Sequence, residues 1–136
     1  MTAEAQGPVI SLMLAVPEAP EAAAWYQTAL GATELWNLGS VIGLEIDGAP
    51  LFLAEPENNG WASPGELGAT TVRVEVFVED PDAFVARAVA AGADGTVDVV
   101  RVHQMPWGEH RQGGFVDPFG HRCLVGDRSP LLPHKQ

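Results

Sequence analysis

Hydrophobic and polar positions in the first half of the chain predict one strand, one helix and then three strands. Apolar residues alternate with polar or small ones over residues 8–16, which indicates a strand. They then recur at helical spacing from Ala22 to Leu30, within a helix that should begin near Glu18 and end at Gly31. Short strand-like segments joined by glycine-containing turns follow at residues 33–38, 41–47 and 50–55.

The second half repeats this order after residues 56–68, a stretch rich in Asn, Gly, Pro and Ser that is typical of a connecting loop. Alternation over residues 71–78 predicts a strand, and Asp80 followed by Pro81 predicts the start of a helix that ends at Gly92. The remaining strands are expected at residues 96–103, 113–116 and 122–126.

The repeat is also visible in the spacing of matched residues. Glu18 and Asp80 lie 62 residues apart, and Gly31 and Gly92 lie 61 apart. Each unit is too small to bury its own sheet face, so the two should pair around a common core and leave a curved cavity. We therefore expect an α+β fold of two tandem βαβββ modules in a single domain. Module one is expected at about residues 8–55, the linker at 56–68, module two at about 69–127 and a tail at 128–136.

Length and composition fit one globular domain without a membrane segment. The 136 residues are 46% hydrophobic, enough to bury a core, but no apolar run approaches the length of a membrane span. Residues 1–7 lack the basic and apolar regions of a signal peptide, so a cytoplasmic protein is expected. The single cysteine, Cys123, lies in an apolar strand, which predicts a buried, unreactive thiol. The net charge of −11 argues against nucleic acid or an anionic membrane as a partner and leaves cationic or neutral small molecules open.

Motifs in the second half of the chain are similar to those of a known superfamily. Trp107-Gly108 precedes the turn Asp117-Pro118-Phe119-Gly120-His121. Residues 78–84 read Val-Glu-Asp-Pro-Asp-Ala-Phe, and the helix that follows ends with Ala-Ala-Gly-Ala at residues 90–93. With the doubled unit, these motifs resemble the vicinal oxygen chelate superfamily of glyoxalase I, bleomycin resistance proteins and extradiol dioxygenases, and most of all its PhnB-like or bleomycin-resistance-like branch. The resemblance covers residues 8–127 and implies the glyoxalase/bleomycin resistance fold, a curved mixed sheet around a ligand cavity.

The resemblance also implies where a metal ion would be bound. Enzymes of this superfamily hold a divalent ion with His and Glu side chains from the first and last strands of each module. The matching positions here are Ser11 and Phe52 or a neighbour in the first module and Arg73 and Leu124 in the second, and Ser, Phe, Arg and Leu side chains do not suit such an ion. Arg73 would repel a cation, and its guanidinium suits a carboxylate, carbonyl or phenolate instead. The four histidines have no ligand-like spacing, so no metal and no cofactor are expected.

The cavity predicted from strand alternation is apolar and aromatic with a few polar anchors, as small-molecule sites tend to be. Aromatic faces would stack a flat ligand, although they also commonly fill a core, and Arg73 with Glu75 could instead form a plain ion pair. Trp61 either folds back onto the core or lines the pocket, and His121 is expected to stabilise its turn. The predicted ligand-binding residues are Ser11, Met13, Trp36, Glu45, Phe52, Trp61, Arg73, Glu75, Phe77, His103, Met105, Trp107 and Leu124.

Three functions are compatible with these residues. The favoured one is a binding protein that sequesters a hydrophobic or aromatic antibiotic or natural product and so gives resistance, as bleomycin resistance proteins do in grooves between two subunits. No catalytic residue is assigned in this interpretation, and the resemblance implies a homodimer. The alternative is a metal-independent isomerase, cyclase or lyase, with Glu75 or His103 as general base and Arg73 stabilising an enolate. The third is a metal enzyme whose ligands lie at other positions.

Overall fold

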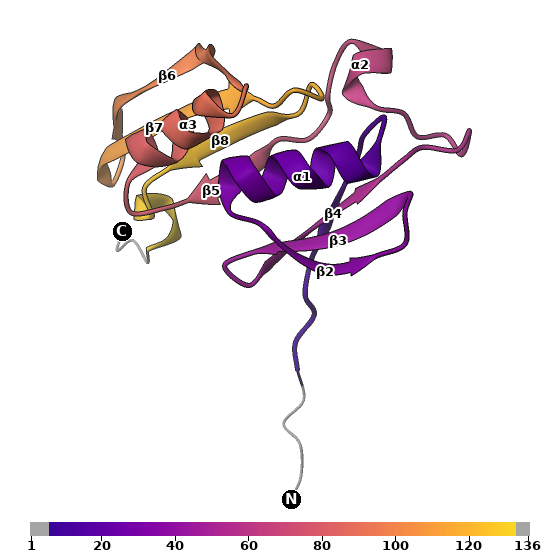
Figure 1. Ribbon diagram of the computed structural model, residues 1–136. Helices are drawn as coiled ribbons and strands as arrows, with labels where there is room; N and C mark the ends of the chain where they lie inside the picture. Colours follow the sequence, from indigo (N-terminus) through magenta and orange to yellow (C-terminus); the bar gives the residue numbers. More distant parts are fainter. Residues whose placement is uncertain (1–5, 133–136) are drawn as a thin grey trace, which may run out of the picture.

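The computed structural model describes residues 6–132 and shows two units of the same design (Figure 1). The elements of the first unit are β1 (Leu12–Ala15), α1 (Ala19–Leu30), β2 (Thr33–Asn37), β3 (Val41–Ile46) and β4 (Ala49–Ala54). The strand order is β1-β4-β3-β2, in which β1 runs parallel to β4 and the other pairs are antiparallel. The helix α1 packs against this sheet on one face.

The second unit repeats the arrangement after a connector that contains a short helix. Its sheet has the order β5-β8-β7-β6, with β5 parallel to β8, and α3 packs against one face. The elements are α2 (Pro64–Leu67), β5 (Val74–Phe77), α3 (Pro81–Ala90), β6 (Asp94–Met105), β7 (Gly108–Val116), β8 (Arg122–Gly126) and the 3-10 turn η1 (Ser129–Leu131). This topology confirms the predicted α+β fold of two βαβββ modules. No helix within residues 6–132 is long and apolar enough to cross a membrane.

Element lengths differ most from expectation in the hairpin of β6 and β7. The sequence predicted a loop between residues 103 and 113, but both strands continue to a two-residue turn at Pro106 and Trp107. The prediction failed because β6 is an edge strand with largely exposed side chains, so it carries little apolar alternation. The predicted strands at 8–16 and 71–78 are shorter, because pairing runs only from Leu12 to Ala15 along β1 and from Val74 to Phe77 along β5.

The two units share one hydrophobic core because their helices pack against each other. The Trp25 indole N–H donates to the Ala91 carbonyl at 2.8 Å, and the Arg87 guanidinium donates to the Thr28 carbonyl at 3.0 Å. Cys123 is buried in this core as expected, and burial together with the nearby Asp117 raises the pKa of its thiol to about 12. The largest fully buried side chains are Tyr26, Phe115, Ile42, Leu44, Leu53, Val16, Val125 and Cys123.

The turn after β7 fixes the second unit to the first helix and the first strand. Asp117 Oδ1 accepts hydrogen bonds from the N–H groups of Phe119 at 2.9 Å and His121 at 2.8 Å, while Oδ2 accepts one from the Tyr26 hydroxyl. The His121 ring nitrogen Nε2 lies 2.7 Å from the carbonyl oxygen of Ala15. His121 therefore holds its own turn through its backbone, and its ring also ties the turn to β1.

The helix start predicted at Asp80 gives a simple test of local structure. Asp80 caps α3, since its side chain accepts a hydrogen bond from the Ala83 N–H at 3.1 Å. Asp80→Ala should lower the free energy of unfolding by about 1 kcal/mol, the usual effect of losing such a cap. Urea denaturation measures the change, and Asp80→Asn, which retains a capping oxygen, should lose less. Equal losses in the two variants would contradict the assignment.

Candidate functional site

Each sheet has a face that the helices leave uncovered, which we call the outer face. In the first sheet, Leu14, Ile42 and Leu53 point to the helix side and are buried in the core. Side chains alternate along a strand, so their neighbours point the opposite way. The outer faces are therefore the surfaces on which the predicted ligand-binding side chains of the strands lie.

Three predicted residues form a continuous row on the outer face of the first sheet. Met13 is paired with Phe52, Phe52 with Gly43, and Gly43 with Trp36, so the row crosses all four strands. The rings of Trp36 and Phe52 meet edge to face, with centroids 4.9 Å apart and planes inclined at 68°. Met13 is 48% exposed and Trp36 is 36% exposed, although both are large and apolar. We call Met13, Phe52, Gly43 and Trp36 the aromatic row.

Gly43 gives the aromatic row its shape. The Trp36 indole lies directly over this glycine, and a Cβ atom added there would collide with the ring. The missing side chain lets the indole lie across the sheet against Phe52. Glu45, two residues along β3 and paired with Thr33 and Pro50, places a carboxylate on the same face. The row thus combines exposed aromatic surface with one nearby charge.

Two other predicted ligand-binding residues, Ser11 and Trp61, lie just before β1 and beside it, respectively. Ser11 directly precedes β1, and its hydroxyl donates to the carbonyl of Leu12 at 3.2 Å. Trp61, in the connector, lines a cavity of about 360 Å³ together with Met13 and His121.

The outer face of the second sheet carries a second group of predicted residues. Glu75 is paired with Leu124, and Phe77 with Gly126, so these side chains share one face. Arg73 lies just before β5. Within residues 6–132, the ion pairs of the structure do not include one between Arg73 and Glu75.

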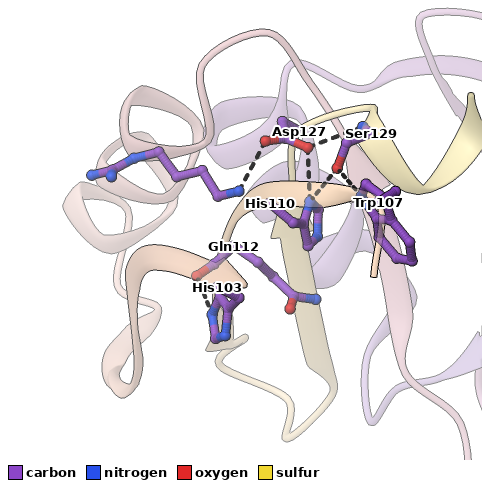
Figure 2. A network of polar contacts seen from close by, with 7 residues as sticks. His103, Trp107, His110, Gln112, Asp127 and Ser129 are labelled. Carbon is purple, nitrogen blue, oxygen red and sulfur yellow. Dashed lines mark hydrogen bonds and ion pairs between the residues drawn. The ribbon is translucent and has the colours of Figure 1, made fainter. Parts of the chain in front are cut away.

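A hydrogen-bonded network joins the β6–β7 hairpin to the turn after β8 (Figure 2). His110 Nδ1 lies 2.7 Å from Asp127 Oδ1 and 3.0 Å from the Ser129 hydroxyl oxygen, which in turn accepts the Trp107 indole N–H at 3.0 Å. Asp127 also accepts the backbone N–H groups of Arg111 at 2.8 Å and Ser129 at 3.0 Å. Partial burial alone would raise the pKa of Asp127, but these hydrogen bonds hold it well below its usual range. The carboxylate is ionised, so Nδ1 is the nitrogen that donates.

The hydrogen bonds of this network are suited to holding side chains in place. Ser129 and Asp127 contact the same nitrogen of His110, whereas a hydrolytic triad needs the hydroxyl and the carboxylate on different ring nitrogens. The His110 ring is buried and lies over Gly126, where an added Cβ would come within 2.7 Å of its Cε1. The network therefore holds Trp107, in the turn of the hairpin, near His110.

Sequence reasoning predicted some members of this region and missed others. His103 is paired with His110, and its Nε2 lies 3.2 Å from the Gln112 carbonyl oxygen. Met105 is paired with Gly108 at the end of the hairpin. His110, Asp127 and Ser129 were not predicted. A loop was expected around residue 110, so the strand register that brings these residues together was not predicted either.

The lowered pKa of Asp127 makes a prediction about acid stability. A carboxyl whose pKa is depressed in the folded state stabilises it above the unfolded-state pKa of about 3.9, and this stabilisation is lost as the pH falls through the folded-state value. Asp127→Asn should therefore be less stable than the wild type at pH 7, and the gap should narrow below about pH 4. Urea unfolding of both proteins from pH 7 to pH 3 measures the gap. A gap of constant size would show that the ionised carboxylate is not what stabilises the turn.

The comparisons with known proteins place this chain in a family. Residues 11–125 match the family described as Glyoxalase-like domain. The chain belongs to this glyoxalase-like family. An uncharacterized protein of Mycobacterium tuberculosis (strain H37Rv) is 36% identical over 129 residues, which cover 88% of this chain and 74% of that protein.

Solved structures agree with this family assignment. The crystal structure of TioX from Micromonospora sp. ML1 is similar to this chain, with a TM-score of 0.66, 26% identity and coverage of 89% of this chain and 98% of TioX. A member of the glyoxalase/bleomycin resistance protein/dioxygenase superfamily from Sphaerobacter thermophilus shares the fold, with a TM-score of 0.67, 20% identity and coverage of 90% and 98%.

The metal positions implied by the fold do not fit a metal ion in this glyoxalase-like chain. Ser11 and Arg73 occupy the first strands or their immediate starts, and Phe52 and Leu124 occupy the matching last strands. No metal ligand comes from the ring of Phe52, the aliphatic side chain of Leu124 or the guanidinium of Arg73. Only the hydroxyl of Ser11 remains at these four positions, where several N or O donors must converge. Within the described part of the chain, no three His, Cys, Asp or Glu residues are grouped so that they could hold an ion.

Proposed function

We propose that this glyoxalase-like protein is a metal-independent binding protein that sequesters an aromatic or hydrophobic antibiotic or natural product. The observation that carries the proposal is the aromatic row, an exposed strip of large apolar side chains held open by a glycine on a rigid sheet. Monomeric proteins rarely leave such surfaces uncovered unless they bind something. The resemblance of the sequence motifs to the bleomycin-resistance-like branch supports the same proposal.

Affinity in this proposal comes from apolar burial and stacking. A flat ring laid against Trp36 and Phe52 would gain about 0.5–1.5 kcal/mol per good aromatic contact beyond the burial of its area. Polar side chains near the apolar surfaces would orient the ligand: Glu45 on the first sheet, and Arg73 and Glu75 on the second. None of these interactions requires the ligand to react.

A homodimer would convert the open outer faces into closed binding grooves. In a single chain the aromatic row lies on one sheet, and Glu75, Phe77 and Leu124 lie on another. A second copy that covers an outer face would supply the opposite wall of a groove, as expected for an isologous pair. Light scattering coupled to size exclusion should give twice the mass of one chain.

Titration calorimetry against a panel of planar aromatic antibiotics tests the proposed function. The protein is prepared in chelator, each binding ligand is recovered from the complex, and its mass is measured. We expect binding that chelator does not weaken and a ligand of unchanged mass. A changed mass would favour the metal-independent isomerase, cyclase or lyase, and binding that requires an added divalent ion would contradict the proposal.

A further inference from the structure

A cavity of about 630 Å³ lies between the two units, along the free edge of β5. Its walls include Leu12 and Leu51 from the first unit and Val74, Val76 and Phe84 from the second. Leu12, Val74 and Phe84 are partly buried and pack against the shared core, so the cavity is an opening in the apolar side of that core. Its volume falls within the range of about 300–1,000 Å³ typical of pockets for drug-sized ligands.

The rim of this cavity is acidic. Asp47, Glu75 and Glu79 line it together with one cation, Arg128. Arg128 is already paired with Glu79, at 2.6 Å between the guanidinium and the carboxylate oxygen. Three carboxylates against one guanidinium leave an excess of two negative charges beside an apolar wall. The net charge of −11 on the whole chain adds to the negative potential there.

The apolar walls and the acidic rim together favour one chemical class of ligand. An apolar body fits the walls, and a positive group at the mouth would lie near the exposed carboxylates of the rim. An anionic group would be repelled by the excess negative charge, and Arg128, the one cation of the lining, is paired with Glu79. A neutral ligand would gain the apolar burial but no attraction at the rim.

We infer that the cavity between the two units binds a hydrophobic cation, with its apolar part among Leu12, Val76 and Phe84 and its positive group at Asp47 and Glu79. This site is separate from the aromatic row of the proposed function, with which it shares no residue. Glu75 and Phe77 of the second outer face do reach its rim, so the test uses residues that belong to the cavity alone.

Calorimetry with three decyl compounds tests the inference on the full chain. The probes are decyltrimethylammonium, decyl maltoside and decyl sulfate, each below its micellar concentration and at low ionic strength. We expect one molecule of the cation per chain, bound several-fold more tightly than the neutral probe, with the anion weakest. Equal affinity for the three head groups, or no binding of the cation, would overturn the inference.

Charge variants at the rim test the role of the carboxylates. Asp47→Asn and Glu79→Gln should each weaken binding of the cation by a few-fold and leave the neutral probe unchanged, whereas Arg128→Ala should strengthen binding of the cation. These side chains are on the surface, so the variants should fold. An unchanged preference for the cation across all three variants would contradict the assigned role of the rim.

Blocking variants separate this cavity from the aromatic row. Val76→Trp fills the cavity and should abolish binding of all three probes, and Leu131→Trp narrows it from an exposed position if the first variant fails to fold. Trp36→Ala alters the aromatic row alone and should leave probe binding intact. Probe binding lost in Trp36→Ala but retained in both blocking variants would overturn the cavity site while leaving the proposed function standing. A dimer that covers β5 and excludes the cation would overturn it as well.

Discussion

Asp117→Ala should lower the free energy of unfolding by about 4 kcal/mol, because two buried donors and one partly buried donor would each lose a partner, at about 1–3 kcal/mol for each unsatisfied group. Asp117 is 3% exposed and accepts hydrogen bonds from the Tyr26 hydroxyl and from the N–H groups of Phe119 and His121. Burial raises the pKa of Asp117, although these three donors favour its ionised form. The carboxyl therefore joins α1 of the first unit to the turn after β7 of the second.

Tyr26→Phe is the matched control for this prediction. It removes one donor and keeps the ring, so the loss should be about 1–2 kcal/mol, well below that of the alanine variant. Urea denaturation at pH 7, followed by far-ultraviolet circular dichroism, measures both. If Asp117→Ala cost no more than Tyr26→Phe, the two backbone donors would not depend on the carboxylate, and the proposed tie between the units would be wrong.

Trp36→Ala should weaken binding of the best panel ligand by roughly 30-fold, which corresponds to about 2 kcal/mol for an aromatic anchor. The indole provides the exposed half of the edge-to-face pair with Phe52, and alanine leaves no ring against which a planar ligand can stack. Gly43→Ala should also weaken binding although it keeps every ring, because its new Cβ displaces the Trp36 indole from its place over β3.

Leu38→Ala serves as the control for the aromatic row. Leu38 is 74% exposed just beyond β2 and lies outside the row, so its loss should change the affinity by less than the experimental error. Calorimetry gives the affinities, and circular dichroism shows that each variant is folded. Undiminished binding by both Trp36→Ala and Gly43→Ala would place the ligand elsewhere.

Much of the fold was predictable because the repeat is encoded locally. Asp80 and Pro81 start a helix through their own chemistry, and Gly31 ends one through its positive φ of 71°. The length of β6 was not predictable, since an exposed edge strand is specified by its partner rather than by its own apolar pattern.

The candidate site was likewise only partly predictable from the sequence. Alternation placed Met13 and Phe52 on the outer face, but it did not show that Gly43 seats the Trp36 ring, because that contact depends on the register of β2 against β3. The pairing of Tyr26 with Asp117 spans 91 residues and follows from the docking of the two units. The cavity along β5 likewise exists only once both units are in place.

The central claim is that the aromatic row binds the ligand without a metal ion. A nitrogen–proton correlation spectrum recorded in chelator during titration with the best panel ligand tests it, since each of the four tryptophans contributes one indole signal. The Trp36 signal should shift in proportion to occupancy, while that of Trp25, whose indole N–H is bonded to Ala91 in the core, should stay in place. Saturating binding that leaves the Trp36 signal unmoved would contradict the account.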